Sequence, residues 1–201
     1  MSGMPAVTRR RECGVDFGDG WLVCQPGQPV DVAGWLADRP DLAPHAEVVR
    51  GLAGQAVEVS SGEDVACVAL LVVPVGEDDL RYGLLRLSLG ELDLPAGPGD
   101  MLDALRESAE RDATVFPGSW QGDTVPLERG GVAVRSRLLD IGDDQGESQS
   151  VYEAVEYLVP SGPDGGPLAQ FVFLTPALDM GDALIELADL VVGTFRWEDP
   201  A

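Results

Sequence analysis

Two apolar segments, separated by a short acidic cluster, most constrain how this 201-residue chain can fold. Val65 to Val75 (VACVALLVVPV) is strongly apolar, and Arg81 to Leu89 (RYGLLRLSL) is rich in leucine. The residues between them, Gly76 to Asp79, are typical of a tight loop. The first segment has about half the length that a membrane-spanning helix needs. The two segments therefore predict an antiparallel β-hairpin whose first strand is buried.

The second half of the chain contains further strand patterns. Residues from Asp123 to Leu139 have a period of two around Gly130-Gly131, which predicts two strands joined by a turn. Val151 to Pro160 alternates in the same way, and Leu168 to Leu174 predicts the last strand. The polar segment from Gly142 to Ser150 is a predicted loop.

The first quarter of the chain is less regular. Val15 to Cys24 contains the turn sequence Gly18-Asp19-Gly20 and fits either a hairpin or a single strand that enters the domain. Between Pro29 and Ala56, apolar residues recur at helical spacing but are interrupted by Pro40 and Pro44. We expect two short helices in this region.

Two longer amphipathic helices are predicted in the remaining segments. The first runs from Asp100, its predicted N-cap, to about Asp112, and the second follows Asp179 as N-cap. After the second helix, we expect the aromatic rings of Phe195-Arg196-Trp197 to fasten the helix end to the sheet. The apolar stripes of these helices consist of Leu102, Leu105 and Ala109 in the first, and of Met180, Leu184, Leu187 and Val191 in the second.

These elements together predict an α+β fold. The strands follow one another as a meander and helices interrupt them rarely, so we expect a mostly antiparallel sheet backed by helices. The length of the chain is compatible with one domain over residues 15–201, preceded by a flexible N-terminal arm of residues 1–14.

The order of these elements resembles the PsbP-like fold. The resemblance covers residues 15–197 and rests on the helix from Asp100 to Asp112, the turn at Gly130-Gly131, the strands YEAVEYLVP and LAQFVFLTP, and the terminal FRW. This fold is shared by photosystem accessory proteins, a nuclear-import factor, small bacterial lipoproteins and the Eag-type chaperones of bacterial secretion systems. Most of them bind other proteins and share no catalytic centre. The resemblance therefore implies a binding role and transfers no catalytic residue.

The charge of the chain argues against several classes of function. There are 35 Asp and Glu residues against 13 arginines, no lysine and one histidine, which gives a formal net charge of −22. Nucleic acids and anionic membranes are bound by concentrated basic surfaces, so neither is an expected partner. Without lysine, and with only His45 to titrate near neutral pH, most general-base and Schiff-base chemistry is unavailable. A protein partner is expected to present a basic surface.

The cysteines and the N-terminal residues indicate in which cellular compartment the protein is found. Cys13, Cys24 and Cys67 are odd in number and widely spaced, which is typical of reduced thiols in a cytosolic protein. Arg9 to Arg11 are not followed by an apolar run of the length found in secretory signals. We therefore expect a cytoplasmic protein without a signal peptide and without membrane insertion.

No motif for catalysis, metal binding or cofactor binding is found. The sequence from Gly118 to Gly122 differs from the G-x-S-x-G elbow, and Asp140 to Val151 lacks the glycine and glutamate that an EF-hand loop requires. Gly162 to Gly166 lacks the G-K-[ST] of a phosphate loop. A glycosidase needs two carboxylates, but no pair can be chosen among 35 acids. We therefore predict a protein that is not an enzyme, with no catalytic residue, metal site or cofactor.

Phe116 and Trp120 are the candidate partner-binding residues. Trp120 lies in a Gly-flanked loop, where a large aromatic side chain can be exposed as an interface anchor. Phe116 and Pro117 can complete an apolar patch with it; alternatively, all three side chains cover the sheet edge. Trp21 and Trp197 lie in periodic segments and are predicted core residues.

Two classes of function remain. The first is a non-enzymatic adaptor or chaperone, such as those linked to bacterial secretion systems, which holds a partner segment such as an apolar helix on a sheet face or in a groove. The alternative is an acidic immunity or inhibitor protein that neutralises a basic enzyme or toxin through electrostatic complementarity. We favour the first class because the acids are spread throughout the chain rather than gathered in one block.

Overall fold

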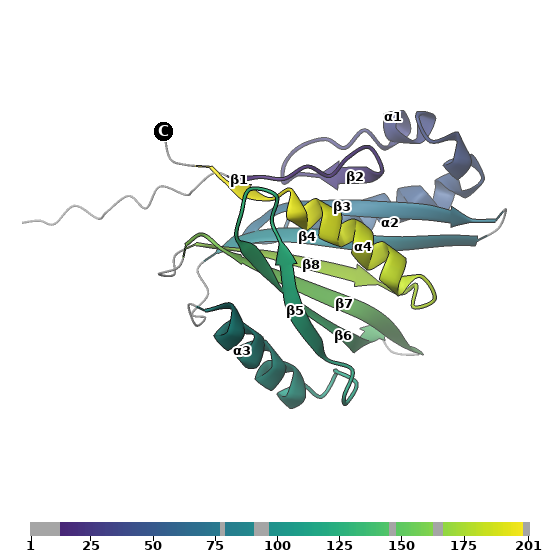
Figure 1. The fold of residues 1–201 in the computed structure, drawn as a ribbon. Coiled ribbons are helices and arrows are strands. Elements are labelled where there is room, and N and C mark those ends of the chain that lie inside the picture. Colours follow the sequence, from purple (N-terminus) through teal and green to yellow (C-terminus); the bar gives the residue numbers. More distant parts are fainter. Residues whose placement is uncertain (1–12, 77–78, 91–96, 145–147, 163–166, 199–201) are drawn as a thin grey trace, which may run out of the picture.

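The computed structural model describes residues 13–76, 79–90, 97–144, 148–162 and 167–198. Most of the expected N-terminal arm, residues 1–14, lies outside the described residues, but its last two residues form the short strand β1 (Cys13–Gly14), which pairs with β9 (Arg196–Trp197). The other strands are β2 (Trp21–Cys24), β3 (Val65–Val75), β4 (Asp79–Gly90), β5 (Gln121–Pro126), β6 (Val132–Asp144), β7 (Ser148–Pro160) and β8 (Leu168–Thr175). They form one antiparallel sheet in the order β2-β3-β4-β8-β7-β6-β5 (Figure 1).

The predicted strand pairs are present in this sheet. β3 and β4 form the hairpin expected from the two apolar segments. β5 and β6 lie on either side of Gly130 and Gly131, whose φ angles of +92° and +87° belong to the left-handed region that glycine adopts readily. With the helices described below, the sheet confirms the α+β class.

Of the two alternatives for Val15 to Cys24, the structure has the single strand, β2, because β1 pairs with β9 and β2 pairs with β3. One strand prediction needs correction. The predicted loop from Gly142 to Ser150 is shorter in the structure, because β6 and β7 extend into it and Gly142 pairs with Ser150. The hydrogen bonds between β6 and β7 thus continue through a polar sequence in which apolar and polar residues do not alternate.

The helices are α1 (Val32–Ala37), the 3-10 helix η1 (Pro40–His45), α2 (Ala46–Ser60), α3 (Pro98–Arg111) and α4 (Gly181–Gly193). Three helical segments therefore replace the two short ones expected between Pro29 and Ala56. Pro40 begins the 3-10 helix, Pro44 lies within it, and α2 starts only after both prolines. α2 is longer than expected because its buried stripe continues past Ala56 to Ser60.

Both predicted helix caps are wrong. α3 begins one turn earlier, with Gly97 as N-cap and Pro98 in its first turn, so Asp100 lies inside the helix. The N-cap of α4 is Met180, whereas Asp179 accepts a hydrogen bond from Arg81 Nη2 at 2.9 Å.

The predicted apolar stripe of α4 is only partly buried. Leu184 and Val191 belong to the core, but Leu187 is 37% exposed, so it does not face the sheet fully. The contacting face of α4 is rotated relative to the prediction and consists of Leu184, Ile185, Ala188, Val191 and Val192.

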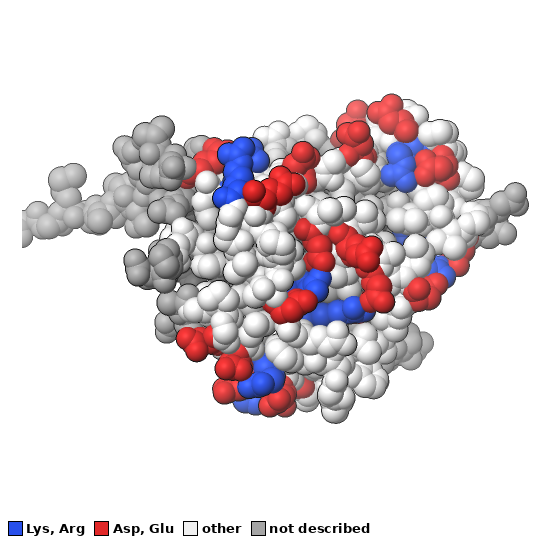
Figure 2. All heavy atoms as spheres, in the orientation of Figure 1, with Lys and Arg blue, Asp and Glu red and all other residues white. Residues whose placement is uncertain are grey.

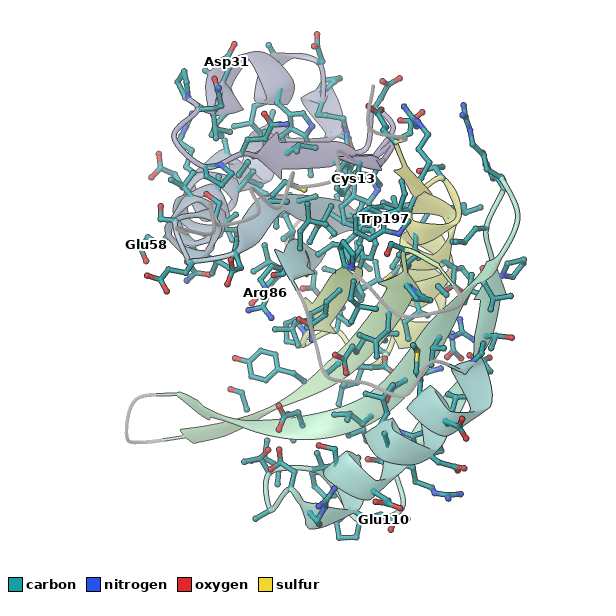
Figure 3. The ribbon with its side chains drawn as sticks, turned by 90° about the vertical axis from the view of Figure 1, so that its left-hand side faces the viewer. Cys13, Asp31, Glu58, Arg86, Glu110 and Trp197 are labelled. Atoms are coloured by element: carbon teal, nitrogen blue, oxygen red, sulfur yellow. The ribbon has the colours of Figure 1, made fainter. Side chains whose placement is uncertain are left out.

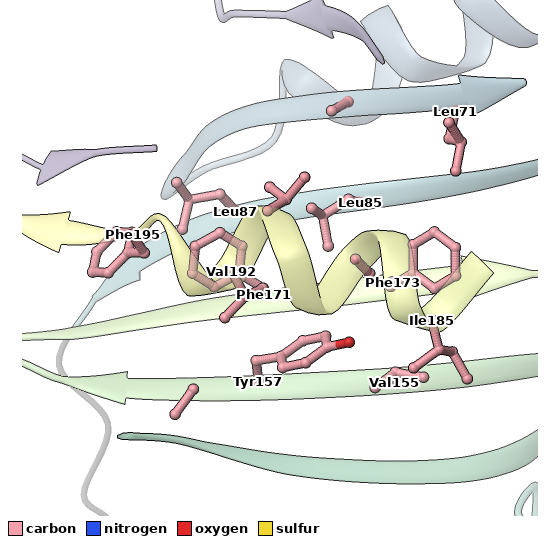
Figure 4. Packing of buried hydrophobic residues seen from close by; sticks show 14 of the residues in the cluster. Leu71, Leu85, Leu87, Val155, Tyr157, Phe171, Phe173, Ile185, Val192 and Phe195 are labelled. Carbon is pink, nitrogen blue, oxygen red and sulfur yellow. The ribbon is translucent and has the colours of Figure 1, made fainter. Parts of the chain in front are cut away.

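Helices cover the two faces of the sheet differently. α4 packs over one face and closes the main core, which contains the fully buried Tyr157, Phe171 and Phe173 (Figure 4). On the other face, α2 packs on Val68, Leu70 and Val72 of β3, whereas α3 packs in a separate cluster on Val134, Leu158 and Leu168. Side chains alternate along each strand, so these two clusters lie on the same face.

Aromatic rings fasten the end of α4 as expected. The ring of Phe195 is perpendicular to those of Phe171 and Trp197, with a distance of 5.3 Å between ring centres in both pairs. The Trp197 indole also donates a hydrogen bond to the Pro160 carbonyl at 3.3 Å. Trp21 is buried, and Trp197 is half-buried against the main core. Within the described ranges, no helix is long and apolar enough to cross a bilayer.

Candidate binding groove

The sheet face opposite α4 is open between two helices. α2 contacts mainly β3 and β2, and α3 contacts mainly β6 and β5. α3 reaches β7 and β8 only at Leu158 and Leu168, so the remaining length of β4, β8 and β7 lies between the two helices. A hollow of about 430 Å³ occupies this position, and we call it the α2–α3 groove. Figure 3 shows Arg86 in this region, between α2, which carries Glu58, and α3, which carries Glu110. The groove is lined by Val59, Val68, Leu84, Arg86, Asp112, Val115, Ser136, Leu138, Asp140, Ala154, Val155, Glu156, Gln170, Val172 and Leu174.

Strand register arranges the groove floor in three rows that cross the sheet. The first row is polar at three of its four positions and consists of Arg86, Val172, Glu156 and Ser136. The second row is apolar throughout and consists of Leu84, Leu174, Ala154 and Leu138. The third row borders an adjoining hollow and contains Tyr82, Tyr152 and Asp140. An apolar row is thus flanked on both sides by rows with polar groups.

The first row holds a half-buried carboxylate. Glu156 Oε1 accepts a hydrogen bond from Gln170 Nε2 at 2.5 Å. Burial raises the pKa of Glu156, and the hydrogen bond from Gln170 and the positive charge of Arg86 offset only part of this effect. The ionised carboxylate is therefore poorly compensated by its own surroundings.

Two further polar atoms in the groove have unused hydrogen-bonding capacity. Arg86 Nε and Asp140 Oδ1 are both buried, and no described residue forms a hydrogen bond with either of them. A buried polar atom without a partner costs about 1–3 kcal/mol. A ligand that supplied an acceptor for Arg86 and a donor for Asp140 would remove this cost.

The α2 wall of the groove is largely uncharged. Val48, Gly51, Gln55 and Val59 recur at intervals of three and four residues, so they share one side of the helix. Gln55 and Val59 line the hollows, and Val48 and Val59 are 56% and 42% exposed. The helix therefore presents an exposed, partly apolar side to the groove.

The candidate residues Phe116 and Trp120 lie at the margin of the groove. Trp120 is half-buried, packs against Gly122 where a Cβ would collide with the indole, and donates from Nε1 to Ser136 Oγ at 2.9 Å. Phe116 is 42% exposed and directly follows Val115, which lines the groove. Partner contact by these two residues stays a prediction.

Sequence reasoning missed the groove residues themselves. Arg86 and Glu156 each interrupt the apolar positions on one face of a strand, and this was an available signal. The sequence does not show that Arg86 and Glu156 lie in the same row. Their strands, β4 and β7, are far apart in the sequence, and both lie next to β8 only because of the order of strands in the sheet.

A cluster of ion pairs occupies the opposite face and joins α4 to the sheet. Arg135 binds Asp123, with 2.5 Å between Nη2 and Oδ2, and also binds Asp189 of α4. Tyr157 donates to Asp189 Oδ1 at 2.8 Å, so every member of the cluster is paired. We assign it a structural role. In the part of the chain that the structure describes, no three His, Cys, Asp or Glu side chains are placed to hold a metal ion.

The comparisons with known proteins add no argument about function. No family model and no curated protein matches this chain. Among solved structures, the chain is similar to a crystal structure of a Bacteroides thetaiotaomicron protein, with a TM-score of 0.36 and 12% identity. The match covers 66% of this chain and 45% of that one, so it spans less than half of the length of that protein. A likeness at this level of TM-score supports no further conclusion.

Proposed function

We propose that this chain is a non-enzymatic adaptor or chaperone that holds a helix of a partner protein in the α2–α3 groove. The observation that carries the proposal is the space between the two helices. From β3 to β6 there are four strand spacings, which amount to about 19 Å. Packed helices lie about 8–10 Å apart, so the layer has room for one more helix between α2 and α3 over the part of the sheet beyond Leu158 and Leu168, where α3 does not cover β7 and β8.

The apolar row of the floor supports a protein partner. Leu174, in the centre of the sheet, is 39% exposed, and Val59 beside it on the wall is 42% exposed. Covering large apolar side chains typically contributes about 1.5–3 kcal/mol for each one that becomes fully buried. A helix with an apolar stripe is suited to this surface, because it can cover the apolar row and Val59 with one continuous apolar face.

The remaining parts of the proposal come from the sequence. The resemblance to the PsbP-like fold favours a binding role, and a cytoplasmic chaperone linked to a bacterial secretion system is the form that we propose. The absence of lysine and the presence of one histidine support a function without catalysis.

Site-specific photo-cross-linking tests the proposal. A photoreactive amino acid replaces Leu174 in the groove, and in a matched protein it replaces Val57, which is equally exposed at 39% but does not line the groove. After irradiation in native lysate, we expect a discrete cross-linked protein from position 174 and not from position 57. The same product should disappear when Leu84→Asp is added. Equal cross-linking from both positions, or none from position 174, would contradict the proposal.

The acidic immunity or inhibitor function remains the second candidate. Its supporting observation is the net charge of −22, to which carboxylates on the face that carries α4 contribute (Figure 2). Such a protein binds a basic enzyme with an affinity that falls steeply as salt rises, whereas burial in an apolar groove tolerates salt. Irradiation carried out in low and in high salt therefore separates the two functions, because only a complex that survives high salt gives the cross-linked product there.

A further inference from the structure

We infer that the partner helix is amphipathic and basic, with cationic side chains at both ends of its apolar stripe. This inference rests on the proposed function and specifies the partner of the same groove. The charges that line the groove are unequal, since Asp112, Asp140 and Glu156 stand against Arg86 alone. A uniformly apolar helix would cover these carboxylates without compensating them, at a cost in free energy.

The positions of two acids define where the cations lie. Glu156 belongs to the first row of the floor and Asp140 to the third, with the apolar row between them. Adjacent rows are two residues apart along a strand, so the first and third rows are separated by about 14 Å. A helix that reaches both acids lies along β6 and β7, because the rows succeed one another along these strands. A helix rises about 1.5 Å per residue and returns to the same face every 3.6 residues, so its two cations should be two or three turns apart, which is about seven or eleven residues.

The local chemistry of each acid agrees with this arrangement. Asp140 lines the groove, and its buried Oδ1 receives no hydrogen bond from any described residue, so a lysine or arginine side chain beside this carboxylate would compensate its charge. The pKa of Glu156 is raised by burial, so a neighbouring cation would stabilise its ionised form. Arg86 lies in the same row, two strands away from Glu156, and would repel such a cation from that side of the carboxylate.

Selection from a displayed helix library tests the inference. The probe is a phage-displayed helix of about 18 residues, or five turns, on one stable scaffold with the positions of one face randomised. Selection on the wild-type protein is compared with selection on the groove variant Leu174→Asp. Helices that are retained only by the wild type should carry Lys or Arg on one face, about seven or eleven residues apart, flanking apolar residues.

Two matched double variants then locate the charge effect. On Glu156→Gln/Asp140→Asn, the affinity of a selected basic helix should fall about five- to tenfold for each removed charge pair. On Glu110→Gln/Asp103→Asn, which removes two exposed acids of α3 that do not line the groove, it should change less than about twofold. Circular dichroism melting confirms that each variant is folded.

The outcomes separate this inference from the proposed function. Both are supported if the selected helices bind the wild type but not Leu174→Asp, carry paired cations, and bind less tightly to Glu156→Gln/Asp140→Asn but not to the α3 control variant. Groove-dependent helices without an excess of cations overturn the inference and leave the proposed function standing. If no helix is retained in a groove-dependent manner, both are overturned.

Discussion

At the scale of single residues, the groove contains side chains that reduce the stability of the free protein. Glu156 is half-buried with a raised pKa, and Asp140 has a buried oxygen without a hydrogen bond from the described residues. Core positions in the same strands, such as Val155 and Tyr157, are fully buried and packed. Groups that cost stability in the free state and face an open groove are typical of binding surfaces.

Replacing Glu156 with glutamine should stabilise the free protein at neutral pH. Because the folded-state pKa of Glu156 is raised, the folded protein holds this proton over a pH range in which the unfolded chain has lost it. The free energy of unfolding therefore falls as the pH rises from the ordinary glutamate pKa through the folded-state pKa. At pH values above the folded-state pKa it keeps this lower value. Glu156→Gln removes this loss of stability and keeps a side-chain oxygen that can accept the hydrogen bond from Gln170.

Urea denaturation at two pH values measures this effect. The midpoint for Glu156→Gln should exceed that of the wild type at neutral pH, and the difference should disappear at a pH below about 4, where glutamate is protonated in both states. Glu110→Gln, an exposed residue of α3, is the control. A lower midpoint for Glu156→Gln at neutral pH would show that Arg86 and Gln170 already stabilise the carboxylate.

Two glycine-to-alanine replacements should change stability in opposite directions. At Gly83 in β4, a Cβ would collide with the fully buried ring of Phe173, so Gly83→Ala should cost about 1–3 kcal/mol. At Gly54 on the exposed side of α2, no atom lies within 4 Å of the added Cβ, so Gly54→Ala should contribute about 0.5–1 kcal/mol of stability. Chemical denaturation of both variants checks the signs, and a stabilising effect at Gly83 would contradict this packing.

At the scale of elements, α4 is joined to the sheet by charge as well as by apolar contact. Arg137 of β6 binds Glu153 of β7 and Asp182 of α4, with 2.7 Å between Nη1 and Asp182 Oδ1. Glu153 is only 4% exposed and is paired with Arg137. The close approach of Gly181 to the Glu153 carboxylate excludes a larger residue at the start of α4.

Removal of Arg137 should destabilise the protein through the charge left on Glu153. We expect Arg137→Gln to cost about 2–4 kcal/mol, because breaking a buried ion pair leaves an uncompensated carboxylate. The double variant Arg137→Gln/Glu153→Gln should recover part of this loss. Arg106→Gln breaks an exposed pair with Asp103 and should cost less than about 1 kcal/mol in the same denaturation experiment. A double variant as unstable as the single one would show that Arg137 acts through packing alone.

Local patterns predicted most elements but not their contacts. The β3–β4 and β5–β6 hairpins followed from alternation and turn residues, which act within a few positions. The cap at Asp179 failed because this residue binds Arg81, 98 positions away in the sequence. Likewise, Glu156 and Arg86 lie in one row only because β8 is inserted between their strands. The groove therefore depends on the order of strands in the sheet, and the alternation of apolar and polar residues within one strand carries no information about that order.

At the scale of the whole molecule, negative charge exceeds what the arginines can neutralise. The chain has 35 acids and 13 arginines, and arginines such as Arg81 and Arg135 already bind two acids each. On the face that carries α4, acidic groups are spread widely rather than gathered in one block (Figure 2). Repulsion among the unneutralised acids acts against the compact state.

Added salt should therefore raise the melting temperature of the protein. Increasing NaCl from about 10 mM to about 300 mM shortens the screening length from about 30 Å to less than 10 Å, which weakens repulsion over the whole surface. Close pairs such as Arg137 with Glu153 are half-buried and are screened much less. Calorimetry across this range should show a steady rise in the melting temperature. A control series at constant ionic strength, with choline replacing sodium, should show no change if screening is the cause. A melting temperature that falls with salt would mean that attractive ion pairs, and not the excess of acids, dominate the electrostatics of the fold.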